Sequence, residues 1–179
     1  MKNSDLILRA KVFATAAHAA VGQKRKYTGE DYINHPAGVV AILRDLNIYA
    51  TKEMIAAAWL HDVIEDTKVN ERQIYSEFGE TVAGYVVGLS KVSTEYDGNR
   101  QVRKEKDRLF LSKQCPAVQT IKCADLIHNT SSIVDHDRAF AKLYLGEMVA
   151  LLDSMEKASD GIRCFAYVVA ETNINKLEN

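Results

Sequence analysis

Apolar side chains recur every three to four residues along most of the chain, with polar side chains at the positions between them. That spacing places the apolar residues on one face of an α-helix. Only two prolines and nine glycines interrupt the pattern. It predicts helices over residues 5–21, 35–46, 51–65, 71–78, 81–92, 100–114, 116–133, 137–157 and 159–177. We therefore expect an all-α fold, a helical bundle of about eight to nine helices with short connections.

Several predicted helices carry residues that favour helix ends. Thr51 is placed to cap the helix over residues 51–65, and Asn70 with Gln73 resembles a capping box before residues 71–78. Gly79 is placed to end that second helix. Pro116 suits a first helical turn, because its missing N–H would have no partner there.

The composition limits the class of protein. At 179 residues and 47% apolar side chains, the chain can bury one continuous core, so we expect a single domain over residues 1–179. A formal net charge of -1 argues against general nucleic-acid binding. Charges interrupt every apolar run and no signal peptide opens the chain, which argues against a membrane partner. Three cysteines without close pairing suit reduced thiols, and we expect a cytoplasmic protein.

The candidate chemistry centres on the pair His61 and Asp62, within the apolar run over residues 56–66. On an unbroken helix His61 would stack on Glu65, and Asp62 on Asp66, because residues four apart share a face. Acids near a helix C-terminus oppose the helix dipole, at a cost of about 0.3–1 kcal/mol per charge. An imidazole and three carboxylates on one face therefore indicate a nearby cation, most simply a metal ion.

Two further residues are candidate metal ligands. His35 stands at the start of the helix over residues 35–46, and Asp125 at the margin of the apolar stripe of residues 116–133. With His61 and Asp62 they supply two nitrogen and two oxygen donors, a set that suits manganese, iron or zinc. Manganese is our first choice. Taken alone, each residue also has a structural interpretation: a histidine before a proline caps or packs, and a single aspartate is usually a surface or capping acid.

The ordered set of motifs resembles the HD-domain phosphohydrolases and, within them, the hydrolase domain of the RelA/SpoT homologues, including stand-alone small alarmone hydrolases. The resemblance covers nearly the whole chain and rests on residues 23–26 followed by 32–36, on 60–67, on 78–79 and on 122–129. A His-Asp doublet alone is weak evidence for this family. The Tyr-Ile-Asn-His-Pro element and the Glu-Asp pair after the doublet separate this subfamily from most other HD proteins.

The resemblance implies a fold, a metal and a reaction. The fold is a single HD domain. The residues that would hold a divalent metal are His35, His61, Asp62 and Asp125. Glu65 and Asp66 would position and deprotonate the attacking water. The substrates would be ppGpp and pppGpp, which would lose the 3′-pyrophosphate to give GDP or GTP and pyrophosphate. No segment is long enough for the family's synthetase domain, so we expect a hydrolase only.

The resemblance also implies contacts with the nucleotide. The residues that would border the nucleobase and the phosphates are Arg25 and Lys26. Further phosphate contacts would come from Arg103 and Lys104, and nucleoside contacts from Asn129 and Tyr144.

Some of these residues have structural alternatives. The basic helix over residues 100–114 can be a solvated face whose cations pair with Glu105 and Asp107. Tyr144 can be a core aromatic residue beside Phe140 and Leu143.

The chain departs from the family pattern next to the Arg-Lys pair. Many relatives have a small polar residue and a Gly-Glu-Pro sequence there, whereas residues 27–31 read Tyr-Thr-Gly-Glu-Asp. Tyr27 would stand beside the base pocket. We hypothesise that adenosine analogues such as ppApp are accepted together with, or instead of, ppGpp.

Two other functions fit parts of the pattern. The same metal site could serve a nucleotidase for nucleoside monophosphates, although the cations around Arg25 and Arg103 favour a longer polyphosphate. A non-catalytic nucleotide-binding regulator is the second alternative, and the complete set of ligands and acids argues against it. In each case we expect a small-molecule nucleotide partner, no nucleic acid and no membrane, and the sequence leaves open a homo-oligomer.

Overall fold

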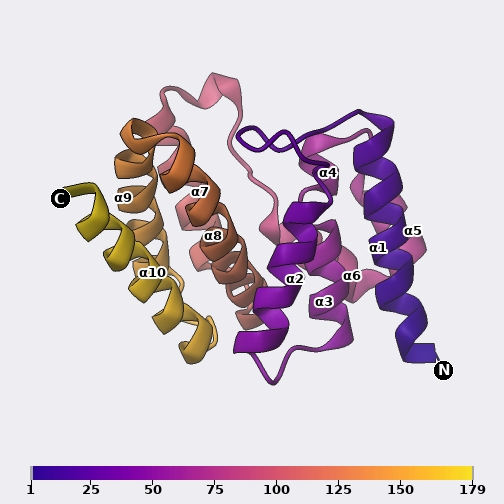
Figure 1. The fold of residues 1–179 in the computed structure, drawn as a ribbon. Helices are drawn as coiled ribbons and strands as arrows, with labels where there is room; N and C mark the ends of the chain where they lie inside the picture. Colours follow the sequence, from indigo (N-terminus) through magenta and orange to yellow (C-terminus); the bar gives the residue numbers. More distant parts are fainter. Residues whose placement is uncertain (1, 179) are drawn as a thin grey trace. The chain divides into compact units, whose positions relative to one another are not determined.

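The computed structural model describes residues 2–178, with side chains from residue 5 onward (Figure 1). Within this range the chain forms ten α-helices, one 3-10 turn and no strand, which confirms the all-α prediction. The chain divides into two compact units, residues 1–90 and residues 91–179. In the described part, no helix combines the length and the apolar character needed to cross a membrane.

The first unit is built around one buried helix, α3 (Lys52–Leu60). Its residues 54–60 are all buried, and α1 (Lys2–Ala20), α2 (Asn34–Leu46) and α6 (Glu80–Leu89) pack against it. A helix that is apolar on all sides is stable only inside a core. The alanines at positions 56–58 are fully buried, and their small side chains allow the neighbouring helices to approach closely. The helix α5 (Glu71–Phe78) packs on α6.

The prediction of one unbroken helix over residues 51–65 is wrong, because the helix breaks after Leu60. His61 and Asp62 form a turn, and a one-turn helix, α4 (Val63–Asp66), follows. Nδ1 of His61 bonds to the carbonyl oxygen of Ala58 at 2.9 Å, and such a side-chain bond competes with helical backbone bonds. Asp62 has φ −99° and ψ −2°, away from ideal helical values. The acids therefore lie on a helix of one turn, whose first turn is also its last, so the dipole penalty expected at the end of a long helix does not apply to them in that form.

The predicted helix ends are confirmed where a local side chain defines them. Thr51 accepts a hydrogen bond from the backbone N–H of Met54 at 3.2 Å. Asn70 and Gln73 form the capping box, and Gly79 ends α5 with a positive φ of 83°. Apart from the break after Leu60, the helices agree with the predicted ranges to within three residues at each end.

Residues 91–178 form the second unit, with a 3-10 turn (Glu95–Asp97) and the helices α7 (Arg100–Ser112), α8 (Pro116–His136), α9 (Arg138–Ser154) and α10 (Asp160–Glu178). Pro116 lies in the first turn of α8, as predicted, and α8 packs against both α9 and α10. The buried amide of Gln119 donates to the carbonyl oxygens of Leu111 and Ser112, both at 3.0 Å. Its Oε1 accepts from the backbone N–H of Lys157 at 2.8 Å. This one side chain therefore ties the end of α7 to the segment before α10.

Candidate active site

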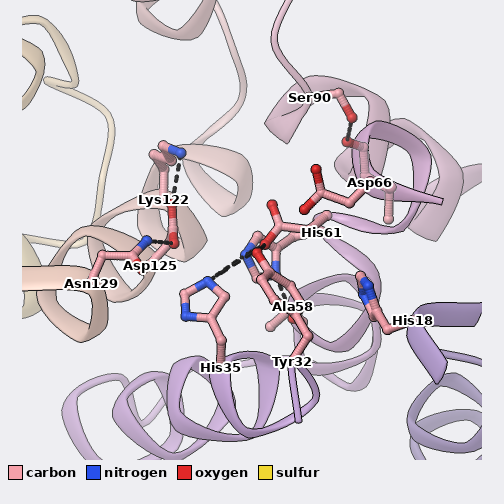
Figure 2. Close-up of polar contacts among 12 residues, drawn as sticks. His18, Tyr32, His35, Ala58, His61, Asp66, Ser90, Lys122, Asp125 and Asn129 are labelled. Carbon is pink, nitrogen blue, oxygen red and sulfur yellow. Dashed lines mark hydrogen bonds and ion pairs between the residues drawn. The ribbon is translucent and has the colours of Figure 1, made fainter. Parts of the chain in front are cut away.

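Three of the predicted metal ligands meet in the first unit: His35, His61 and Asp62 (Figure 2). The Nε2 atoms of the two histidines are 3.1 Å apart. Oδ2 of Asp62 lies 2.9 Å from Nε2 of His61 and 3.5 Å from Nε2 of His35. Both histidines are buried, whereas the side chain of Asp62 is 21% exposed. The cluster therefore lies at the edge of the core, with one side open to solvent.

The hydrogen bond of His61 indicates whether this cluster can hold a metal ion. Its Nδ1 faces the carbonyl oxygen of Ala58, which can only accept, so Nδ1 carries the proton. In the neutral ring Nε2 then presents a lone pair toward the carboxylate of Asp62, and a cation shared between these groups would stabilise the arrangement. Two ligand atoms about 2.1 Å from one ion lie about 3.0–3.4 Å apart. The observed separations of 2.9, 3.1 and 3.5 Å are close to this range, so the cluster fits a divalent metal.

His61 and Asp62 are consecutive in sequence, and both side chains reach the same point. The two residues stand at the turn between α3 and α4 and keep φ and ψ in the right-handed helical region. Successive side chains on an α-helix point about 100° apart, yet Nε2 of His61 and Oδ2 of Asp62 meet at 2.9 Å. His35 reaches the same point from the first turn of α2.

Tyr32 supports the cluster from the loop before α2. Its hydroxyl donates to Oδ2 of Asp62 at 2.5 Å, and its ring centre lies 5.6 Å from that of His35. A hydrogen bond from outside the ligand set fixes the orientation of a ligating carboxylate. Tyr32 belongs to one of the recognised motifs but was not predicted as a functional residue. Its position three residues before His35 is the signal that could have identified it.

The two predicted catalytic acids, Glu65 and Asp66, lie on α4 immediately after the cluster. Glu65 is half-buried and Asp66 is exposed. The backbone N–H of Asp66 donates to the carbonyl oxygen of Asp62 at 2.9 Å, so α4 is tied directly to a candidate ligand. Both acids therefore come from the helical turn that follows Asp62, as the sequence indicated.

Arg25 and Lys26 lie in the loop between α1 and α2. The guanidinium carbon of Arg25 is 6.0 Å from the ring centre of Tyr32, which places it beside the residue that bonds Asp62. The ammonium of Lys26 is 4.7 Å from the ring centre of Tyr27. The structure therefore brings Arg25 to the neighbourhood of the cluster and pairs Lys26 with the aromatic residue that departs from the family pattern.

Asp125 belongs to the second unit, on α8. It is only 4% exposed, so it is not the surface acid of the structural interpretation. Lys122 donates to Oδ2 and Asn129 donates to Oδ1, each at 2.7 Å (Figure 2). Lys122 therefore braces Asp125, and the role of Asp125 as a fourth ligand stays a prediction.

On the basic helix α7, some cationic side chains form ion pairs and others do not. Arg108 pairs with Glu105 at 2.6 Å, and Lys106 pairs with Asp97 at 2.7 Å. Among the described residues, neither Arg103 nor Lys104 forms an ion pair. Loss of water around its ammonium lowers the pKa of Lys104, and the positive charge of Lys122 lowers it further. The solvated-face interpretation therefore holds for part of α7 only.

Tyr144 lies on α9 and is half-buried. Its ring centre is 6.3 Å from that of Phe140, and its hydroxyl donates to the carbonyl oxygen of Leu126 at 3.1 Å. The contact with Phe140 belongs to the structural alternative, but Tyr144 is not a core residue and Leu143 is exposed. A contact between Tyr144 and a nucleoside stays a prediction.

The chain belongs to the HD domain family, whose sequence profile matches residues 10–142. A Synechocystis protein named probable guanosine-3′,5′-bis(diphosphate) 3′-pyrophosphohydrolase is 38% identical over 131 residues, which make up 72% of this chain. A Haemophilus influenzae protein named guanosine-3′,5′-bis(diphosphate) 3′-pyrophosphohydrolase is 38% identical over 121 residues, 66% of this chain. The matched segment is 17% of the length of each of these two relatives.

A solved structure of a metazoan ortholog of SpoT, described as hydrolysing ppGpp, matches with a TM-score of 0.83 at 21% identity. The match covers 93% of this chain and 94% of the other. At this identity the likeness shows the fold. The two curated relatives support the resemblance to HD hydrolases of the RelA/SpoT type.

Proposed function

We propose that this chain is a metal-dependent hydrolase that removes the 3′-pyrophosphate from ppGpp and pppGpp, with GDP or GTP and pyrophosphate as products. The observation that carries the proposal is the cluster of His35, His61 and Asp62, followed by two acids on the next helical turn. The names of the curated relatives favour this substrate class over a nucleoside monophosphate. The family profile extends across both units, which supports one HD domain over the whole chain.

In this proposal His35, His61 and Asp62 hold a divalent ion, and Asp125 is the fourth ligand. Imidazole and carboxylate donors suit manganese, iron and zinc, and the share of hard oxygen donors favours manganese. When bound, such an ion lowers the pKa of water and offsets negative charge on phosphoryl oxygens. Asp125 suits the role because it is buried, and Lys122 and Asn129 hold its carboxylate in one orientation.

Glu65 and Asp66 accept the proton that the reaction releases. Water attacks the phosphorus bonded to the 3′ oxygen, and the bond between that phosphorus and the 3′ oxygen breaks. The water loses a proton as it attacks, and the 3′ oxygen of the product gains one. A carboxylate within reach of the water accelerates this step by accepting its proton. The half-buried Glu65 and the exposed Asp66 lie on the turn that follows Asp62, where a substrate can reach them.

The cations of the chain bind the phosphates and the base in this proposal. Arg25 lies 6.0 Å from the ring centre of Tyr32, and a guanidinium can stack on a base as well as bind phosphate. Arg103 and Lys104 are the cations of α7 that form no ion pair among the described residues, and we assign them to phosphate. Asn129 and Tyr144 are assigned to the nucleoside.

We further propose that ppApp is a substrate, because Tyr27 stands where many relatives have a small residue. The contact between Tyr27 and Lys26 gives the loop an aromatic face with a charged edge, which suits stacking on either purine. The groups at positions 2 and 6 distinguish adenine from guanine, and no described residue is assigned to read them. Side-by-side turnover of the two nucleotides tests this extension.

The substrate class is tested with a panel of ppGpp, ppApp, GMP and AMP, each incubated with manganese-loaded protein. We expect pyrophosphate and a nucleoside 5′-diphosphate from ppGpp, and no orthophosphate from either monophosphate. Orthophosphate release from GMP or AMP, without cleavage of ppGpp, would replace this proposal with the nucleotidase. Binding of ppGpp without any turnover would favour the non-catalytic regulator.

A further inference from the structure

His18 and Gln23 connect α1 to Asp66 through consecutive hydrogen bonds. Nδ1 of His18 lies 2.6 Å from Oε1 of Gln23, and Nε2 of Gln23 donates to Oδ2 of Asp66 at 2.8 Å. We propose that His18 and Gln23 are positioning residues, which hold the carboxylate of Asp66 in the orientation that the hydrolysis requires. This inference rests on the proposed function, because it takes Asp66 to be a proton acceptor.

The direction of both bonds follows from the chemistry of the three groups. The Asp66 carboxylate can only accept when it is ionised, so the end of the Gln23 amide that faces it must be the NH2 group. The other end of the amide is then the carbonyl oxygen, which must accept from His18. His18 therefore carries its proton on Nδ1. A substitution that removes the donor of His18, or the donor or acceptor of the Gln23 amide, therefore breaks the connection between His18 and Asp66.

The backbone holds His18 and Gln23 at a fixed separation. After α1 the N–H of Gly22 donates to the carbonyl oxygen of Ala19 at 3.0 Å, and the N–H of Gln23 donates to that of His18 at 3.1 Å. These two bonds form the Schellman motif, which needs a residue with positive φ, and Gly22 has φ 63°. His18 and Gln23 are thus joined through both backbone and side chains. Such a double connection suits a residue that must hold its partner in one orientation.

The surroundings of His18 keep its ring neutral. The residue is 2% exposed, and among the described residues no hydrogen-bond partner approaches Nε2. A proton on Nε2 would therefore be buried without an acceptor. Burial lowers the pKa of His18 and outweighs the bond to Gln23, which raises it. The neutral ring with its proton on Nδ1 is the form that orients Gln23 toward Asp66.

A second contact links His18 to the metal cluster. Its ring centre lies 4.7 Å from that of Tyr32, whose hydroxyl bonds Asp62 (Figure 2). A purely structural role, in which His18 fills space under Tyr32, is the alternative explanation. The two roles need different properties of the side chain. Filling space needs volume, whereas positioning needs a donor at the place of Nδ1.

Two substitutions at His18 separate these roles. His18→Leu keeps the approximate volume and removes the donor, whereas His18→Asn loses volume but places an N–H donor near the position of Nδ1. We expect His18→Leu to lower kcat toward ppGpp by about 10-fold to 100-fold, with KM unchanged. This is the range for loss of a residue that supports an active-site group from outside the ligand set. His18→Asn should retain more activity than His18→Leu although it melts at a lower temperature. Gln23→Glu, which cannot donate to Asp66, should lower kcat as His18→Leu does.

Equal kcat values for wild type and His18→Leu, or kcat values that follow the melting temperatures of the two variants, would overturn the positioning role. Long-range 1H–15N spectra of the wild-type protein give a readout that needs no substrate. They should show neutral His18 with its proton on Nδ1, and a proton on Nε2 would contradict the proposal. Absence of ppGpp turnover by the wild type, with the Nδ1 proton present, would instead refute the proposed function while leaving the hydrogen bonds intact.

Discussion

His35 and His61 are 26 positions apart in sequence, and their Nε2 atoms lie 3.1 Å apart. The first turn of α2 supplies one ring and the turn after α3 supplies the other. Asp62 adds a carboxylate oxygen 2.9 Å from the second ring. Three electron-pair donors at such distances are stable together when they share a cation, and the first prediction follows from this requirement.

Substitution of a ligand should remove metal and activity together. His61→Ala deletes one of the three converging atoms, so we expect the purified variant to contain little manganese and to show no turnover. Glu65→Gln should keep its metal and lose activity by about 100-fold or more, the scale of losing a general base. Metal content by mass spectrometry and kcat, measured on the same samples, check both variants. Loss of metal from Glu65→Gln would show that Glu65 is a ligand.

The hydroxyl of Tyr32 should strengthen metal binding. Tyr32→Phe removes the bond to Asp62 but keeps the ring contacts with His18 and His35. We expect the Kd for manganese to rise by about 10-fold, because a lost bond to a ligating group typically weakens a site by 10-fold to 100-fold. The Kd is measured by titration of metal-free protein. Tyr167→Phe is the matched control, since it removes a hydrogen bond of 2.6 Å to Asp153 in the second unit. Equal Kd values for the two variants would contradict this role.

Two lysines of α7 should differ in their effect on substrate binding. Lys104 has no ion pair among the described residues, whereas Lys106 pairs with Asp97 at 2.7 Å. Lys104→Ala should raise KM for ppGpp by about 10-fold, the effect of losing one charged hydrogen bond, with kcat little changed. Lys106→Ala removes the same charge from the same helix and should leave KM near the wild-type value. Equal increases in KM would mean that α7 acts only through its overall charge.

The lowered pKa of Lys104 also gives this contact a pH dependence. A lysine with a lowered pKa loses its proton at a lower pH than an ordinary lysine. The contribution of Lys104 to phosphate binding should therefore decline as the pH rises through its lowered pKa, at a lower pH than for an ordinary lysine. In Lys104→Ala, the alkaline rise in KM should be smaller than in the wild type. A rise of the same size in both proteins would assign it to another group.

The three cysteines should react unequally with alkylating reagents. Cys123 is buried on α8, and burial raises its pKa to about 12, whereas Cys115 and Cys164 are exposed. The thiolate is the reactive form, so at pH 8 the Cys123 thiol stays protonated and unreactive. Iodoacetamide should label the two exposed thiols in the folded protein, and all three in denaturant. Peptide mass spectrometry reads the sites, and labelling of Cys123 in the folded protein would contradict its burial.

Features that depend on neighbouring residues were predictable from the sequence. The capping box involves Asn70 and Gln73, three residues apart, and both of its hydrogen bonds are present as predicted. The same holds for the cap at Thr51 and for Pro116 in a first turn. Each of these signals acts within one helical turn, so no tertiary contact is needed to interpret it.

Features that depend on side chains meeting across the fold were not predictable in the same way. The apolar pattern over residues 51–65 continues through His61, whereas the folded helix ends at Leu60 and the His61 ring bonds to the carbonyl oxygen of Ala58. The contact between Gln23 and Asp66 joins residues 43 apart, and no periodicity indicates it. His18 carries no motif signal, and only the folded chain shows that its ring reaches Gln23. His35, His61 and Asp62 could be named as candidate metal ligands from their donor types, and the family resemblance implied the same set, but only the fold shows that these three side chains meet.

The central claim is that this chain cleaves the 3′-pyrophosphate of ppGpp, and product analysis tests it most directly. Manganese-loaded protein is incubated with ppGpp, and an Asp66→Asn variant with the same metal content is the control. We predict that the wild type forms GDP and pyrophosphate in equal amounts, and that the variant forms neither at a comparable rate. Failure of the metal-loaded wild type to release pyrophosphate, or release of orthophosphate in its place, would contradict the account.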